Sequence, residues 1–225
     1  MRGSVLGALA ALAGTVALLA CTTQPSKAPA EWDGLEKREV KGVDQVYLRP
    51  NVQFAPYNKV MLDPVQVEFS KSWDPNSSRD LSRHLDSQDL QKIKDTLGGW
   101  VREGFAAELS KAGYVITDAP GDDTLRVSAA IINLYISAPD VQTAGRSKTY
   151  TTEAGSMTLV MEVRDAPSGQ LLARVLDAQR ADSAGGRMQC RNSVTNQADA
   201  QRIIAAWAKK FREGLDRLKA KNDGA

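Results

Sequence analysis

The sequence has very little of the residues on which most enzymes and metalloproteins depend for chemistry. It contains one histidine, His84, and two cysteines, Cys21 and Cys190, in 225 residues. A metal site of several imidazoles is therefore excluded, and any Ser-His-Asp triad would have to use His84. Two cysteines cannot build a disulfide scaffold, and modification of Cys21 would leave Cys190 without a partner in the same chain.

The chain also lacks an excess of charge of either sign. Its 29 lysines and arginines nearly balance its 27 aspartates and glutamates, which gives a formal net charge of +2. A nucleic-acid-binding protein normally has a strongly basic domain or a basic stripe, so we expect no nucleic-acid partner. The hydrophobic content of 42% is ordinary for a globular protein, and the length favours a single domain.

What the sequence does have is an apolar amino-terminal segment that ends at a cysteine. Arg2 is followed by an uncharged stretch, VLGALAALAGTVALLA, at residues 5–20. A basic tip, a short apolar core and small residues at the end are typical of a secretory signal peptide, and the stretch is short for a membrane-spanning helix. Residues 1–20 are therefore predicted to be a signal peptide; the alternative is an uncleaved membrane helix.

The four residues LLAC, at 18–21, resemble a bacterial lipobox. In such signals a peptidase cuts between a small residue, here Ala20, and a cysteine whose thiol, nucleophilic as the thiolate, carries a diacylglycerol. We therefore predict cleavage between Ala20 and Cys21, lipidation of Cys21 and attachment to a membrane through that lipid. Thr22 stands where an aspartate retains lipoproteins of enteric bacteria in the inner membrane, which favours the periplasmic face of the outer membrane.

The residues after the cysteine are predicted to separate the lipid from the folded domain. Residues 22–45 are polar, hold two prolines and two glycines, and show no period of 2 or 3.6. Together with the lipidated cysteine they form a predicted flexible tether, residues 21–45. The alternative is that Trp32 and Leu35 dock on the domain. Residues 46–225 are predicted to be a single α+β domain.

Two segments of this domain have helical periodicity. Apolar residues recur every three or four positions over residues 88–112, with Ser87 as the expected N-cap and Gly113 as the expected end. A second helix is predicted over residues 197–219, with Asn196 as its cap.

The other regular segments alternate between apolar and polar residues, which predicts strands. A bulge is expected near Ile131, and the DAPSG segment at residues 165–169 is expected to turn a hairpin. The order of elements predicts a two-layer α+β sandwich, a mostly antiparallel sheet with both helices packed on one face. The predicted strands are residues 58–69, 114–117, 124–137, 155–165 and 170–180.

Three of these segments carry a resemblance to a known family. NKVMLDPVQVEF, LSKAGYVITDAPGDDTLRVSAAIINL and VMEVRDAPSGQLLARVLDAQ resemble the lipoproteins grouped as domain of unknown function 3313. The resemblance covers most of the chain after the predicted tether and includes the lipobox. It implies an envelope α+β domain and carries over no catalytic residues.

Several carboxylates are candidates for acid–base or calcium chemistry. Asp63 precedes a proline inside an apolar strand, where a carboxylate needs a partner such as Arg126. Asp122, Asp123 and Asp165 lie at predicted turns, and hydrogen bonding to their own downstream backbone explains them better than chemistry does.

The remaining candidates lie in polar loops. His84 is expected to be solvated. Cys190, between two arginines, is either an ordinary cysteine or a thiol made reactive by the nearby cations. Basic residues in two loops are expected to be solvated surface, with contact to lipid phosphates or an acidic partner as the alternative: Arg180, Arg187 and Arg191 in one loop, Arg146 and Lys148 in the other.

These observations predict a non-catalytic, lipid-anchored protein of the bacterial envelope whose domain binds an envelope protein or aids assembly. We expect no cofactor, no metal and no catalytic residue. One alternative is an accessory lipoprotein of an export or lipid-transport system, which as a lipid carrier would need an apolar cavity. A less favoured alternative is a periplasmic hydrolase that depends on His84 and Asp63.

Overall fold

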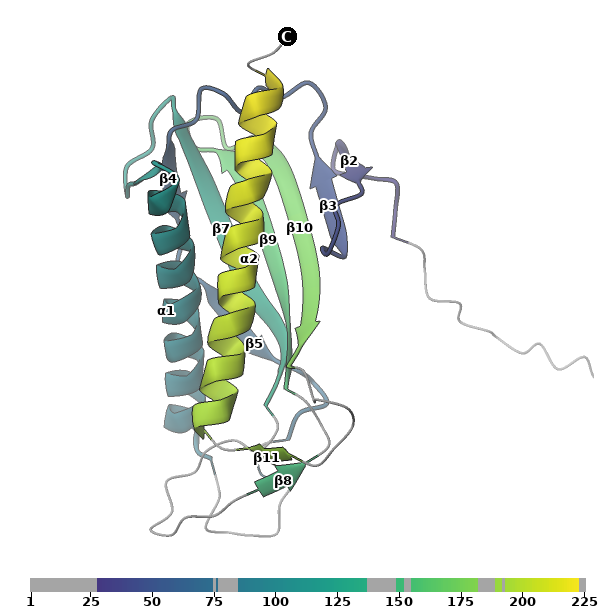
Figure 1. Ribbon diagram of the computed structural model, residues 1–225, viewed down its shortest axis with the longest axis vertical. Helices are drawn as coiled ribbons and strands as arrows, with labels where there is room; N and C mark the ends of the chain where they lie inside the picture. Colours follow the sequence, from purple (N-terminus) through teal and green to yellow (C-terminus); the bar gives the residue numbers. More distant parts are fainter. Residues whose placement is uncertain are drawn as a thin grey trace, which may run out of the picture.

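The computed structural model describes residues 28–74, 76, 85–136, 149–151, 155–181, 189–191 and 193–222. These residues form a nine-stranded sheet with two long helices packed on one of its faces (Figure 1). The predicted two-layer α+β sandwich is therefore confirmed.

The sheet is mixed and mostly antiparallel. Its strands follow the order β1-β2-β3-β10-β9-β7-β4-β6, and β5 pairs with β7 beside β4. Only the β4–β6, β4–β7 and β5–β7 pairs are parallel. The strands are β1 (Glu31–Trp32), β2 (Leu35–Arg38), β3 (Gln45–Leu48), β4 (Lys59–Leu62), β5 (Gln66–Phe69), β6 (Val115–Ile116), β7 (Thr124–Tyr135), β9 (Ser156–Asp165) and β10 (Leu171–Arg180). β8 (Thr149–Thr151) and β11 (Gln189–Arg191) pair with each other separately.

The long strands follow their predicted patterns. The β9–β10 hairpin turns through residues 165–169, where Gly169 takes the positive φ of 69° that the turn requires. In β7 the register against β9 shifts between Ile132 and Tyr135, and Asn133 has a positive φ. The bulge expected near Ile131 is confirmed, and it keeps Leu134 on the buried face.

Helix α1 (Ser87–Lys111) begins and ends one residue earlier than predicted, and Gly113 follows its C-cap, Ala112. Its N-cap is Asp86, whose carboxylate accepts hydrogen bonds from the N–H groups of Gln88 and Asp89, at 2.7 and 2.9 Å. The Asp89 carboxylate accepts the N–H of Asp86 in return, at 3.2 Å. The prediction of Ser87 as the cap is wrong because only Asp86 can form this reciprocal capping box.

Helix α2 (Ser193–Asn222) begins before the predicted cap, Asn196, which lies inside the helix. The apolar stripe that set the predicted start begins more than one turn later, at Ala200 and Ile203, so periodicity could not mark the boundary. Among the described residues no helix is both long and apolar enough to cross a bilayer.

The core lies between the helices and the sheet. Each helix turns one apolar stripe toward the inward residues of β4, β7, β9 and β10. The rings of Phe105 and Phe211 are 5.7 Å apart where the two stripes meet. The most buried helical residues are Leu97, Val101, Phe105, Leu109, Ile204, Trp207, Ala208 and Leu215.

The prediction of a flexible tether over residues 21–45 is wrong for its second half. β1 and β2 form a hairpin and β2 pairs with β3, so the sheet extends back to Glu31. Leu35 is fully buried against Tyr47 and Leu171, and the removal of this apolar surface from water favours docking. The alternative, that Trp32 and Leu35 dock on the domain, is the one the structure has. Residues 21–27 lie outside the described part.

The glycines of α1 provide a matched test of how closely the helices pack. A Cβ atom on Gly104 would lie 2.9 Å from the Cγ2 atom of Ile204 on α2, whereas a Cβ on Gly99 meets nothing within 4 Å. We expect Gly104→Ala to lower the free energy of unfolding by about 1 kcal/mol, since overpacking outweighs helix propensity. Gly99→Ala is expected to raise it by up to ~1 kcal/mol. Urea unfolding followed by tryptophan fluorescence measures both, and equal effects would contradict close contact at Gly104.

Candidate functional site

Arg174 is the one basic side chain of the described residues that is buried, with 9% of its surface exposed. It lies on β10 beside Glu162 of β9 and Tyr47 of β3. Its neighbours Ala173 and Val175 belong to the core, so Arg174 lies on the face of the sheet opposite the helices.

The guanidinium of Arg174 joins β9 and the β1–β2 turn to β10 through charged hydrogen bonds. Its Nε and Nη2 atoms donate to Oε1 of Glu162, at 3.0 and 2.6 Å, and its Nη1 donates to Oδ2 of Asp33, at 2.9 Å. The ring of Trp32 stacks on it, with its centroid 4.1 Å from Cζ. Such fork-like contacts hold both partners at fixed angles. The Arg174 cluster therefore ties the β1–β2 turn to the middle of the sheet.

The carboxylate of Glu162 is shared by two arginines. Arg164 donates from Nη2 to Oε2 of Glu162 at 2.6 Å, while Arg174 occupies Oε1. Burial alone would raise the pKa of Glu162, but the hydrogen bonds from Arg174 and Arg164 outweigh it and hold that pKa below its ordinary value. Glu162 is therefore ionised at neutral pH and balances the buried guanidinium.

Further contacts hold the chain just before and after β1. The Tyr47 hydroxyl donates to the carbonyl of Pro29 at 3.0 Å, and its ring meets Trp32 edge-on with centroids 5.7 Å apart. Arg49 donates to the carbonyl of Leu171 at 2.6 Å and to that of Asp33 at 3.3 Å. We call the set formed by Trp32, Asp33, Tyr47, Glu162 and Arg174 the N-terminal attachment site.

A second buried charge lies on the helix side of β10. Asp177 is 1% exposed, and its carboxylate accepts hydrogen bonds from Nε1 of Trp207 at 2.7 Å and from the backbone N–H of Asp44 at 3.1 Å. The Asp44 carboxylate in turn accepts the backbone N–H of Ala178 at 2.9 Å. Ala178 lies on β10 past the last residue that pairs with β3, so this N–H would otherwise be unpaired at the edge of the sheet. Asp177 therefore fixes α2 and the start of β3 to the same strand.

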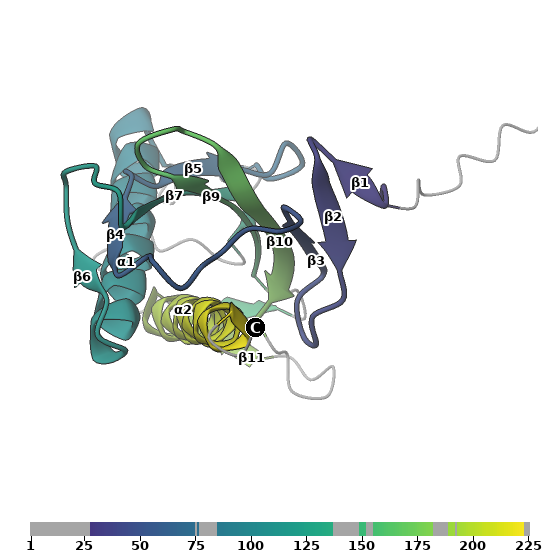
Figure 2. The same ribbon diagram turned by 90° about the horizontal axis from the view of Figure 1, so that it is seen from above.

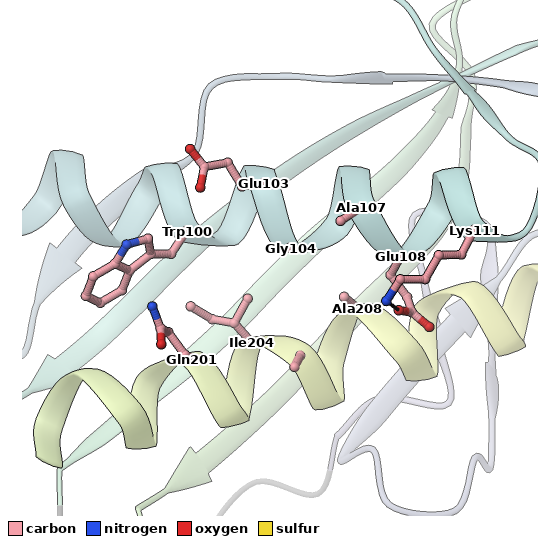
Figure 3. Close-up of a pocket in the computed structure, with 10 residues that line it drawn as sticks. Trp100, Glu103, Gly104, Ala107, Glu108, Lys111, Gln201, Ile204 and Ala208 are labelled. Atoms are coloured by element: carbon pink, nitrogen blue, oxygen red, sulfur yellow. Dashed lines mark hydrogen bonds and ion pairs between the residues drawn. The ribbon is translucent and has the colours of Figure 1, made fainter. Parts of the chain in front are cut away.

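The two helices enclose a groove of about 360 Å³ (Figure 3). Ile204 points from α2 toward α1 at Gly104, and the ion pair of Glu108 with Lys111, at 3.0 Å, lies toward one end. The groove opens on the solvent side of the helix pair, since it is lined in part by the exposed Ala107 and Ala205. The remaining lining residues are Trp100, Glu103, Gln201 and Ala208.

The groove has an apolar floor and a polar rim. Its floor is made of small and aliphatic side chains, and charged and amide groups stand around it, as in the centre and rim of many protein interfaces. The lining residues include no serine, cysteine or histidine.

The structure gives the candidate carboxylates structural partners. Both carboxylate oxygens of Asp63 accept from Nε of Arg126, at 3.0 and 2.9 Å, which confirms the predicted partner, and the hydroxyl of Ser128 donates to the same carboxylate. Asp165 accepts the backbone N–H of Ser168 at 3.0 Å, as a turn aspartate should. Asp122 and Asp123 lie in the turn before β7, where Asp123 pairs with Lys59 at 3.2 Å. The described residues contain no cluster of acidic, histidine or cysteine side chains suited to a metal.

Most of the other predicted residues are not described, or are described only for their backbone. Cys190 and Arg191 belong to β11, but their side chains are not described, and Arg180 is the last residue of β10. The predictions for the cleavage site, the lipid and the basic loops therefore remain predictions. The residues not described at all are Ala20, Cys21, His84, Arg146, Lys148 and Arg187.

Sequence reasoning missed the N-terminal attachment site. A usable signal was present at Asp33 and Gly34, because Asp-Gly between apolar residues is a strong indication of a two-residue hairpin turn. The structure has that turn, with positive φ angles of 55° and 72°. Arg174 gave no such signal, since a charged residue that alternates with core residues is normally exposed.

The architecture and these sites define an α+β sandwich with its amino-terminal segment bound to the outer face of the sheet. The family model described as "Protein of unknown function (DUF3313)" matches residues 24–211. The chain therefore belongs to the DUF3313 family, as the resemblance in its sequence implied. None of the curated proteins matches the chain.

Solved structures show only distant likeness. The PelC dodecamer from Paraburkholderia phytofirmans is 14% identical, with 73% of this chain and 95% of that chain covered and a TM-score of 0.37. Protein XCC0632 from Xanthomonas campestris is 9% identical, with 79% and 93% covered and a TM-score of 0.39. A minor lipoprotein from Acinetobacter baumannii is 9% identical, with 73% and 92% covered and a TM-score of 0.29. Likenesses at this level carry no information about function.

Removal of the buried guanidinium is expected to release the β1–β2 hairpin. Arg174→Ala leaves Asp33 without this partner and Glu162 with Arg164 alone, and we expect a loss of about 2 kcal/mol in the free energy of unfolding. Arg126→Ala, which breaks a pair at the surface, is the control and should cost at most about 1 kcal/mol. Urea unfolding gives both values, and amide hydrogen exchange over residues 31–38 should accelerate only in Arg174→Ala. Equal losses, or unchanged exchange, would contradict the attachment.

The lowered pKa of Glu162 predicts a pH-dependent contribution to stability. Because its pKa is below the ordinary 4.5 in the folded protein, its contribution is complete above that value and is lost as the pH falls through the lowered pKa. Glu162→Gln should therefore be less stable than the wild type at pH 7, and the difference should shrink as the pH falls below ~4. Thermal unfolding between pH 7 and pH 3 measures this difference. A gap that stays constant on acidification would show that Glu162 is not the titrating group.

Proposed function

We propose that this protein is a lipid-anchored component of the bacterial envelope that binds another envelope protein at the periplasmic face of the outer membrane and catalyses no reaction. The observation that carries the proposal is the LLAC segment at residues 18–21. It lies a few residues before Pro29, whose carbonyl is hydrogen-bonded to Tyr47 of the folded domain. A lipid on Cys21 would confine the domain to the membrane surface and raise its effective concentration for partners there.

The groove between α1 and α2 is the surface we assign to the partner. Its apolar floor is accessible, since Ala107 and Ala205 are exposed, and its rim carries Glu103 and the Glu108–Lys111 pair. Burial of such a floor supplies affinity, while the charged rim supplies specificity.

The alternatives find less support in this geometry. A lipid carrier needs an enclosed apolar cavity, and the groove opens to solvent and has charged groups at its rim. A hydrolase would depend on His84 and Asp63, and Asp63 is held by Arg126 and by the hydroxyl of Ser128 at the edge of the sheet.

The proposal predicts which position on α2 crosslinks to the partner protein in living cells. A photo-crosslinking amino acid at Ala205, in the groove, should yield a discrete adduct of higher mass. The same amino acid at Ala206, which is exposed but does not line the groove, should yield little or none. Mass spectrometry of the Ala205 adduct would identify the partner.

The lipid is tested in the same cells. Globomycin should cause a larger precursor to accumulate, because cleavage between Ala20 and Cys21 requires the lipoprotein signal peptidase. Absence of a precursor would contradict the anchor, and equal adducts at Ala205 and Ala206 would contradict the groove as the binding surface.

A further inference from the structure

We infer that the edge of the sheet formed by β1, β2 and β3 faces the bilayer and that the α1–α2 pair faces away from it. This orientation rests on the proposed function, because it requires a lipid on Cys21. It follows from the shortness of the chain between that cysteine and the first residue bound to the domain.

The connection to the lipid is short relative to the domain. Pro29 is held by the hydroxyl of Tyr47, and Lys37 donates its N–H to the carbonyl of Ala30 at 2.9 Å. Seven residues, 22–28, therefore separate Cys21 from the bound chain. The eight residue steps from Cys21 to Pro29 span at most ~29 Å even when fully extended. The 30 residues of α2 alone extend over about 45 Å. A body of that size cannot turn freely on so short a connection.

The point of attachment is also fixed on the body. The N-terminal attachment site holds the β1–β2 hairpin through Asp33 and Trp32, and both contact Arg174 in the middle of the sheet. The lipid connection therefore leaves the domain beside β1. This point of departure is fixed on the domain, whereas it would move if residues 29–38 were a flexible segment.

The opposite end of the sheet lies far from this side. β1 and β6 are the first and last strands of the sheet order, and β10, which the β1–β2 turn contacts, lies four strand spacings from β6, about 19 Å. Figure 2 shows β1 and β2 at one side of the molecule and β6 with α1 at the other. The solvent side of the helix pair is consequently turned away from β1.

Charge does not supply the orientation. Apart from Asp33, which is paired with Arg174, residues 31–41 carry three acidic and three basic side chains. A balanced surface gains little from anionic headgroups. The short connection, and not an affinity of this edge for lipid, is what we expect to orient the domain.

Energy transfer to the membrane tests this orientation in the full-length lipidated protein. In a Cys190→Ser background, a donor fluorophore is attached to Glu31→Cys, which is exposed on β1, or to Val115→Cys, which is 56% exposed on β6. The variants are reconstituted into vesicles of phosphatidylethanolamine and phosphatidylglycerol that contain headgroup-labelled acceptor lipid. We expect transfer from position 31 to be at least about twofold more efficient than from position 115.

A longer connection provides the matched control. Twenty Gly/Ser residues inserted between Ser26 and Lys27 should bring the two efficiencies close together. A difference that persists with the insertion would overturn the inference, because the edge would then bind lipid by itself. Equal efficiencies without the insertion would overturn it as well.

Failure of the anchor is seen separately. The mass of the purified amino terminus shows whether Cys21 carries lipid before any transfer is measured. A protein without lipid would overturn the proposed function together with the orientation, whereas a lipidated protein with equal transfer would overturn the orientation alone. Urea unfolding of each labelled variant verifies that the domain remains folded.

Discussion

A guanidinium that keeps only about a tenth of its surface in water must be matched by carboxylates, because an unpaired buried charge costs several kcal/mol. Arg174 is matched by Glu162 from the neighbouring strand and by Asp33 from a turn 141 residues away in the sequence. Glu162 lies next to Arg174 in the β9–β10 hairpin whether or not the β1–β2 turn is docked. The buried charge of Arg174 therefore fixes the position of Asp33. Replacement of such a pair by apolar residues is often neutral in stability. The effect of the Arg174–Asp33 pair is therefore on geometry, because the pair holds the β1–β2 turn at one position on the sheet.

Strand β10 carries both buried charges of the described chain, on opposite faces. Arg174 binds the amino-terminal hairpin on the outer face, and Asp177, three residues later, binds Trp207 of α2 on the inner face. The apolar core holds the helices against the sheet without specifying their exact position along it. A hydrogen bond from an indole to a buried carboxylate is directional, so it specifies where α2 lies along β10. One strand thus positions the two parts of the chain that the proposed function uses, the attached amino terminus and one wall of the groove.

The parts of this fold that could be predicted are those written in local patterns. The β9–β10 hairpin and the inward stripes of both helices follow from alternation, periodicity and turn residues alone. The errors occur where a local pattern is short or where the partner is remote. β1 has two residues, too few for a period, and only the Asp33–Gly34 pair marks its turn. Arg174 and Asp177 look like surface residues in the sequence, because their burial depends on Asp33, Asp44 and Trp207, which no spacing relates to them. The site therefore could not be predicted, although the β9–β10 hairpin that carries Glu162 and Arg174 was.

The correction to the tether changes how a lipid-anchored protein of this kind would work. A flexible segment of twenty-four residues would let the domain sample many orientations and a large volume, which suits the capture of partners that diffuse freely. With the proposed lipid on Cys21, a connection of seven residues to a fixed point on the sheet would limit both the height and the orientation of the domain above the bilayer. A partner at the groove would then meet a surface that already has one orientation, so little rotational freedom would be lost on binding. Such preorganisation favours assembly with another component fixed in the same membrane, and this is the class of partner that we propose for the face formed by α1 and α2.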